Sequence, residues 1–250
     1  MGNSKIDWTD KTWNPITGCA KISAGCENCY AENIARRFWG DRKFSDIQLH
    51  EDRLEQPLHW KKPAKIFVNS MGDLFHPDVT ADGIFRVLTV IGLCPQHTFM
   101  ILTKRPDRMK IYFDQLNVAE LKSSMIVNAR RMGLRKAYEV GLYEDIKYPL
   151  ENLWLGVTAE NQEMADERIP ILLRIPAAKR FVSVEPMLSA VDLTMLNYEN
   201  MANINSLGGL HGVFQPLSHE CNKLDWVIAG GETGKKARIC YPASVRSLRS

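Results

Sequence analysis

The chain has 250 residues, of which 45% are hydrophobic and 24% charged, which is the composition of a globular protein and excludes a disordered or fibrous one. Its 32 Lys and Arg against 29 Asp and Glu give a net charge of +3, too even to indicate a nucleic-acid coat by itself. The most apolar stretch, residues 84–94, contains Arg86 and is too short to span a bilayer, and the first residues lack a signal peptide's apolar run. We therefore expect a cytoplasmic protein without membrane segments.

Short apolar runs bounded by polar residues, Gly or Pro predict six strands. They cover residues 12–17, 65–69, 98–103, 153–158, 180–184 and 225–229. Segments with a helical pattern lie between them, at residues 31–39, 81–93, 107–115 and 162–173. Strands that alternate with helices predict an α/β fold built from parallel βα units.

Two segments are additional to this repeat. Residues 116–151 are rich in helix formers and predict a helical insertion, whereas residues 192–224 carry Asn, Ser and Gly-Gly and predict an irregular one. Residues 242–250 begin like a helix and stop without a capping residue, so we expect the last barrel element to be truncated. No linker divides the chain, which predicts one domain over residues 1–250.

Chemically reactive or charged side chains follow every predicted strand. In chain order they are the cysteine loop of residues 18–30, then Asp73, Lys104, Glu160 with Asn161, Glu185 and Glu232. The carboxyl ends of the strands in a βα barrel meet on one face, and active sites are built there. The sequence therefore predicts one active site formed by these strand ends.

The cysteine loop holds three of the six cysteines. Six residues separate Cys19 from Cys26 and two separate Cys26 from Cys29. Cytosolic thiols stay reduced, which favours a metal site over disulfides. A structural zinc ion needs a fourth ligand, for which His50 or His59 is available, whereas a 4Fe–4S cluster on three cysteines keeps one iron open. The spacing leaves both alternatives open.

Seven motifs together resemble the phage-associated three-cysteine-motif proteins of bacteriophages and prophages. They are DWTDKTWNPITGC at 7–19, GCENCYAE at 25–32, NSMGDLFH at 69–76, LTKRP at 102–106, LGVTAEN at 155–161, SVEPM at 183–187 and AGGETG at 229–234. Those proteins look like relatives of radical S-adenosylmethionine (SAM) enzymes, in which a three-cysteine 4Fe–4S cluster follows the first strand. The resemblance implies a partial (βα)6 barrel of the radical-SAM type.

The same resemblance implies a cofactor site. Cys19, Cys26 and Cys29 would each hold an iron of a 4Fe–4S cluster, and S-adenosyl-L-methionine would chelate the fourth iron. In radical enzymes a segment after the second strand binds the cofactor's ammonium group, and here that segment contains Ser70, Gly72 and Asp73.

Further roles follow from the other strand ends. Glu160 or Asn161 is expected at the ribose hydroxyls, and Tyr30, the aromatic residue beside the third cysteine, is expected to contact the cofactor. Lys104 is a candidate for binding a phosphate or carboxylate, and Glu185 and Glu232 are candidates for contacting the substrate or the cofactor. Asp73, Lys104, Glu185 and Glu232 form the expected catalytic set.

The implied function is that of a phage or prophage enzyme that reductively cleaves SAM to modify a nucleotide, nucleic acid or peptide. It implies an electron donor of the flavodoxin or ferredoxin type and a phage-encoded partner protein. Four basic residues are candidate nucleic-acid contacts, namely Arg36, Arg37, Arg42 and Lys43. The alternative is a non-catalytic zinc or iron–sulfur protein in which the three cysteines only clip the loop together.

Overall fold

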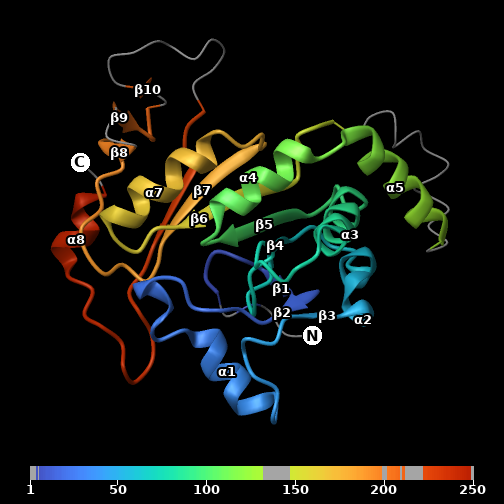
Figure 1. Cartoon of the computed structure of the whole chain (residues 1–250), viewed down its shortest axis with the longest axis horizontal. Coiled ribbons are helices and arrows are strands. Elements are labelled where there is room, and N and C mark those ends of the chain that lie inside the picture. Colours follow the sequence, from blue (N-terminus) through green and yellow to red (C-terminus); the bar gives the residue numbers. More distant parts are fainter. Residues whose placement is uncertain are drawn as a thin grey trace.

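A six-stranded parallel sheet forms the centre of the protein (Figure 1). The computed structural model describes residues 4, 6–131, 147–198, 202–208, 210–211 and 222–248. The strand order is β1-β4-β5-β6-β7-β11, and every neighbouring pair is parallel. The strands are β1 (Lys11–Trp13), β4 (Lys65–Val68), β5 (Thr98–Thr103), β6 (Leu153–Thr158), β7 (Lys179–Val184) and β11 (Trp226–Ala229). Within the described residues β1 and β11 each pair on one side only, so the parallel α/β sheet is established and the partial barrel stays a prediction.

The first predicted strand is interrupted. Residues 12–17 were expected to be continuous, but β1 ends at Trp13 and Ile16–Thr17 forms a separate strand, β2, which pairs antiparallel with β3 (Gln48–Leu49). Pro15 lies in the break, where it has no amide hydrogen to donate to a neighbouring strand. The break directs the chain away from the sheet just before the cysteine loop.

Helices connect the strands close to the predicted positions. They are α1 (Tyr30–Phe38), α2 (Glu51–Leu54), α3 (Ala81–Gly92), α4 (Pro106–Gln115), α5 (Val118–Arg131), α7 (Gln162–Leu173) and α8 (Pro242–Ser247), with short 3-10 helices η1 (Ala24–Cys26) and η2 (Gln56–His59). Capping side chains fix two of the starts: Thr80 accepts from the Gly83 amide, and Asn161 accepts from the Met164 amide. Pro106 starts α4, where a missing amide hydrogen costs nothing.

The two predicted insertions have different outcomes. The helical one contains α5, and its residues 132–146 lie outside the described part. The segment expected to be irregular instead contains a small antiparallel sheet of β8 (Leu196–Tyr198), β9 (Ala202–Asn205) and β10 (Leu210–His211). Leu196 faces Ile204 across this sheet, and both side chains are buried. Strands this short carry too few apolar residues for their period to be seen in the sequence.

The two faces of the parallel sheet carry different cores. On one face, strand residues such as Ile66, Ile101 and Val182 pack against apolar side chains of α3, α4 and α7. On the other face, Met100, Phe181 and Ile228 pack with tryptophans, including Trp8 of the N-terminal segment. In Figure 1, α1 lies away from α3, α4 and α7, below the sheet.

Small and polar residues replace the aromatic ones toward the carboxyl ends of the strands on this second face. Gly156 lies beside Phe181, where a Cβ atom would come within 2.5 Å of the ring. Thr158 and Ser183 follow two residues further along their strands, and both line a cavity. The change from large to small side chains along the strands leaves room for that cavity, which lies next to the aromatic side chains of this face. None of the described helices has the length and apolar character needed to cross a membrane.

Candidate functional site

The cavity opens at the carboxyl ends of the parallel strands and has a volume of about 1130 Å³, open solvent included. Most of the predicted site residues line it, namely Cys19, Cys26, Cys29, Tyr30, Ser70, Gly72, Asp73, Lys104, Glu185 and Glu232. Glu160 and Asn161 are not in its lining. The structure thus brings together residues as far apart in the sequence as Cys19 and Glu232.

The cysteine loop is held close to the segment that follows β4. Gly18 and Gly72 form an isolated parallel bridge, and a Cβ atom on Gly72 would lie 2.9 Å from the Gly18 carbonyl oxygen. Gly18 has a φ of +103°, a conformation that glycine adopts without strain. Only a residue without a side chain fits this close approach, so Gly72 positions the loop through its backbone.

A hydrogen bond from Tyr30 connects the loop to the segment after β4, and a second hydrogen bond connects that segment to Asn14. The Tyr30 hydroxyl donates to the Ser70 carbonyl oxygen across 2.7 Å, and the Ser70 hydroxyl donates to Asn14 across 3.2 Å. Tyr30 and Ser70, both predicted to contact a cofactor, therefore also join the start of α1 to the segment after β4.

The three cysteines are free thiols on one wall of the cavity. Nowhere in the described residues do three His, Cys, Asp or Glu side chains come close enough to share a single metal ion. Neither His50 nor His59 lines the cavity, and the His50 ring is hydrogen-bonded to Thr17. A 4Fe–4S cluster is larger than one ion, and each cysteine binds a different iron, so three separated thiols facing a common space fit it. No histidine among the described residues lines this cavity, so the fourth ligand of the Cys3His zinc site considered from the sequence is not found there.

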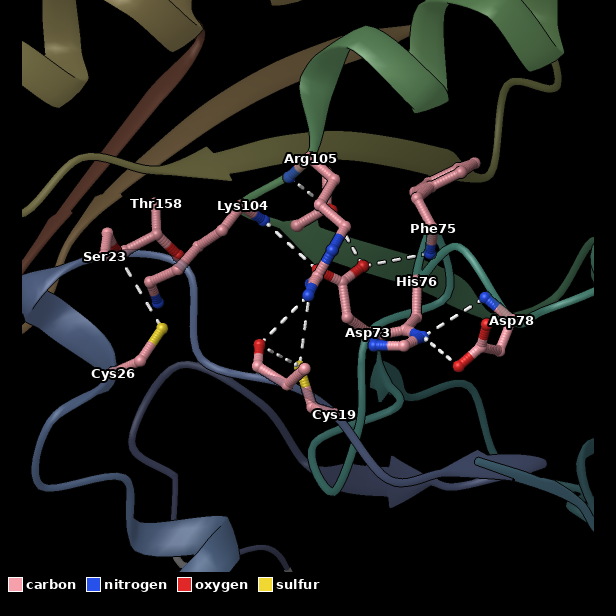
Figure 2. A network of polar contacts seen from close by, with 12 residues as sticks. Cys19, Ser23, Cys26, Asp73, Phe75, His76, Asp78, Lys104, Arg105 and Thr158 are labelled. Atoms are coloured by element: carbon pink, nitrogen blue, oxygen red, sulfur yellow. Dashed lines mark hydrogen bonds and ion pairs between the residues drawn. The ribbon is translucent and has the colours of Figure 1, made fainter. Parts of the chain in front are cut away.

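Arg105 connects Asp73 to Cys19 (Figure 2). Its Nη1 donates to Asp73 Oδ2 at 2.8 Å and lies 3.6 Å from the Cys19 sulfur, while Nη2 donates to the Ala20 carbonyl at 3.0 Å. Asp73 also accepts from the Thr103 hydroxyl and the Phe75 amide, at 2.8 and 2.9 Å. The carboxylate expected to bind the cofactor's ammonium group is therefore occupied by protein donors.

The environment of Cys19 opposes ionisation. Burial and the negative charge of Asp73 raise its pKa to about 11, although Arg105 acts in the opposite direction. Arg105 was not among the predicted site residues, which included only its neighbour Lys104. The useful signal was the pair itself, because two adjacent cations at a strand end can serve different partners.

Lys104 has a separate role from its neighbour. Among the described residues its amine has no hydrogen-bond or ion-pair partner, and Figure 2 shows the side chain extended toward the Cys26 sulfur. Burial opposes the Cys26 thiolate, but the Lys104 charge and hydrogen bonds from the Ile22 and Ser23 backbone outweigh it and lower the Cys26 pKa. Lys104 therefore makes the Cys26 thiol more readily ionised than the Cys19 thiol.

Glu160 holds the cysteine loop through a hydrogen bond to its backbone. Its Oε1 accepts from the Gly25 amide at 3.0 Å, and its Oε2 pairs with Arg168 Nη1 at 3.0 Å, with side chains 0% and 2% exposed. The adjacent Asn161 caps α7 through the Met164 amide at 2.9 Å. Both residues, predicted to contact ribose hydroxyls, make structural contacts outside the cavity.

Glu232 connects the cysteine loop to the segment after β11 through hydrogen bonds. It accepts from the Asn28 amide at 2.9 Å and from the Arg238 guanidinium, and these hydrogen bonds lower its pKa to about 2. Glu185 differs, because no described residue donates to its carboxylate. Partial burial and nearby Asp7 raise the pKa of Glu185, while Lys104 acts in the opposite direction. Of the predicted carboxylates, Glu185 is the one available to a ligand in the cavity.

Fold and site together define a parallel α/β protein with three free cysteines at the carboxyl edge of its sheet. The chain belongs to the family described as protein of unknown function (DUF5131), which it matches over residues 3–250. A solved structure of a cysteine-to-serine mutant of spore photoproduct lyase is similar, with a TM-score of 0.43 and 13% identity. That match covers 74% of this chain and 48% of that chain, so this chain spans about half its length. Comparison with curated proteins found no match.

Proposed function

We propose that the chain is a radical SAM enzyme that holds a 4Fe–4S cluster on Cys19, Cys26 and Cys29. The observation that carries this proposal is the position of the three free thiols in the same cavity as the carboxyl ends of the parallel strands. A cluster bound there faces the cavity that Lys104 and Glu185 also line. Three cysteines leave one iron open for that cofactor.

When bound, the cluster supplies one electron for cleaving a carbon–sulfur bond of SAM. The protein's own residues hold and shield the reacting groups. Arg105 places a positive charge beside Cys19 and neutralises Asp73, which lowers the cost of collecting thiolates in a partly buried site. The aromatic floor formed by Trp8 and Phe67 excludes water from the inner end of the cavity.

Two residues are free to bind the ligand's charged groups. Lys104 offers an ammonium group for a carboxylate, and Glu185 offers a carboxylate for an ammonium group. In this proposal Glu185 takes the ammonium-binding role that the sequence suggested for Asp73. The substrate is a nucleotide, nucleic acid or peptide, and the electron donor is a small flavodoxin- or ferredoxin-type protein. A phage setting and a phage-encoded partner belong to the same proposal.

The test is anaerobic reconstitution with iron and sulfide, followed by iron and labile-sulfide analysis and electron paramagnetic resonance. We expect a 4Fe–4S signal that changes when SAM is added, and loss of the signal in a Cys26→Ala variant. Cys94→Ala is the matched control, because Cys94 lies in the apolar core and should not affect iron binding. Stoichiometric zinc without labile sulfide would overturn the proposal and favour a structural clip.

A further inference from the structure

A second cavity lies where β2, the end of α1 and α2 meet. Its volume is about 400 Å³, open solvent included, and it is lined by Thr17, Trp39, Arg42, His50 and Arg53. Two of these five residues carry a permanent positive charge, His50 can carry one, and none is acidic. The cavity therefore has the lining of a site for an anion.

Arg42 is fixed in place without being neutralised. Its Nη2 donates to the carbonyl and hydroxyl oxygens of Thr17, at 3.1 and 3.0 Å, and to the Asp46 carbonyl at 2.6 Å. The guanidinium also lies over the Trp39 ring, 4.1 Å from its centre. No carboxylate pairs with Arg42 in the described part of the chain. A rigidly held guanidinium with unused donors loses little entropy when it binds a ligand.

Arg53 supplies a second unneutralised charge. Its guanidinium has no hydrogen-bond or ion-pair partner among the residues that the structure describes. The two nearby carboxylates do not enter the cavity, since Asp46 accepts from the Lys43 amide and Asp52 is outside the lining. Burial is the largest cause of the lowered pKa of His50, and the charges of Arg53 and Arg42 come next. Asp52 has a smaller effect in the opposite direction. A bound anion would relieve the repulsion between these cations.

The surroundings favour a phosphate group of a nucleic-acid strand. Planar guanidinium groups match phosphate oxygens with paired hydrogen bonds. Phe38 directly precedes Trp39 of the cavity lining in the sequence and is 68% exposed, and the Arg37 guanidinium lies 5.1 Å from its ring centre. Exposed aromatic rings beside basic residues are the usual means of binding single-stranded nucleic acid, because bases stack on the rings. An acidic protein would use the charges but not the exposed ring.

We propose that Arg42 and Arg53 bind a backbone phosphate of single-stranded nucleic acid, with a neighbouring base stacked on Phe38. This site requires no cluster and so goes beyond the proposed function. Thr17 is two residues from Cys19, so a strand held here lies on the segment that leads into the cysteine loop.

The experiment measures binding of a labelled single-stranded DNA oligonucleotide to the reduced, cluster-free chain by fluorescence anisotropy at several salt concentrations. Arg53→Gln should weaken binding about tenfold and reduce the salt slope by about 1, because one phosphate contact is lost. Arg53→Lys should retain most of the slope. Arg246→Gln is the matched control, since this exposed arginine on α8 lies outside the second cavity, and it should bind as the unmodified chain does.

A second arm distinguishes the possible ligands. Inorganic phosphate should compete only weakly with the oligonucleotide. Phe38→Ala should weaken binding of the oligonucleotide and leave the competition by phosphate unchanged. Equal oligonucleotide binding by Arg53→Gln and the unmodified chain would overturn the proposal. The proposal would also be overturned if a poly-glutamate peptide, or phosphate alone, bound as tightly as the oligonucleotide and lost affinity in Arg53→Gln. A Cys19→Ser variant should lose iron and keep the oligonucleotide, so that failure of the proposed function is distinguishable from failure of this one.

Discussion

Arg105 and Asp73 form a nearly buried ion pair between two strand ends, with Nη1 2.8 Å from Oδ2 and side chains 10% and 7% exposed. The same nitrogen lies 3.6 Å from the Cys19 sulfur, so one cation serves both a carboxylate and a thiol. The pair connects the segments after β4 and β5 to the cysteine loop. Asp73 thus contributes to the site by holding Arg105.

Replacing Arg105 with Gln should destabilise the cluster-free protein. The substitution leaves the Asp73 carboxylate buried beside Cys19 with only the Thr103 and backbone donors. Removing one partner of a buried pair costs about 3–5 kcal/mol of unfolding free energy. Urea denaturation of the reduced protein measures this loss, and Arg105→Lys should recover part of it.

Arg86→Gln is the control for that experiment. Its partner Glu51 has a side chain that is 65% exposed, so this pair should contribute only about 0–1 kcal/mol. Equal losses in Arg105→Gln and Arg86→Gln would mean that burial of the Asp73 pair is not what stabilises the loop.

Replacing Lys104 with Met should slow alkylation of Cys26. The Lys104 charge lowers the Cys26 pKa, so its removal raises that pKa and leaves less reactive thiolate near neutral pH. We expect Cys26 in the cluster-free chain to react with iodoacetamide faster than Cys19, and several-fold more slowly after the substitution. Mass spectrometry of the labelled peptides measures both rates. Cys19 is the internal reference, and an unchanged Cys26 rate in Lys104→Met would contradict the prediction.

Replacing Glu160 with Ala should release the cysteine loop. The substitution removes the acceptor of the Gly25 amide and leaves the buried Arg168 without its carboxylate. We expect tryptic cleavage after Lys21 to become several-fold faster under conditions in which the protein stays folded. Glu167→Ala, on α7 next to Arg168, is the control, because Glu167 is exposed and should leave the rate unchanged. Equal cleavage rates in the two variants would show that Glu160 does not hold the loop.

Strongly patterned elements were predictable from the sequence, and those that depend on tertiary contacts were not. Strands β5 and β6 are continuous apolar runs, and α7 begins at the expected residue because Asn161 is a strong cap. Strands β8 and β9 were missed because their burial depends mainly on Leu196 meeting Ile204 across the small sheet.

The site was predictable at the level of strand ends but not of individual contacts. Placing reactive residues after each strand was enough to find the cavity. The sequence does not say which way adjacent side chains point. Lys104 extends toward Cys26 while Arg105 turns to Asp73 (Figure 2). Glu160 accepts from the Gly25 amide, while Asn161 caps a helix. Such divisions between neighbours depend on the packing around them.

Replacing Glu232 with Gln should remove a contribution to stability that depends on pH. Hydrogen bonds from Arg238 and Asn28 lower the Glu232 pKa from 4.5 to about 2, so the folded protein favours the ionised carboxylate. A lowered pKa stabilises the fold fully above pH 4.5, and this stabilisation is lost as the pH falls toward 2.

The difference in unfolding free energy between the unmodified chain and Glu232→Gln should therefore be constant near neutral pH and shrink below pH 4.5. Urea denaturation from neutral pH to about pH 3 measures it. Glu27→Gln is the control, because Glu27 pairs with the same Arg238 at 2.9 Å through a side chain that is 69% exposed. That exposed pair should contribute less than about 1 kcal/mol at every pH. A difference for Glu232→Gln that stays constant down to about pH 3 would show that the carboxylate's charge is not what fastens the loop to the segment after β11.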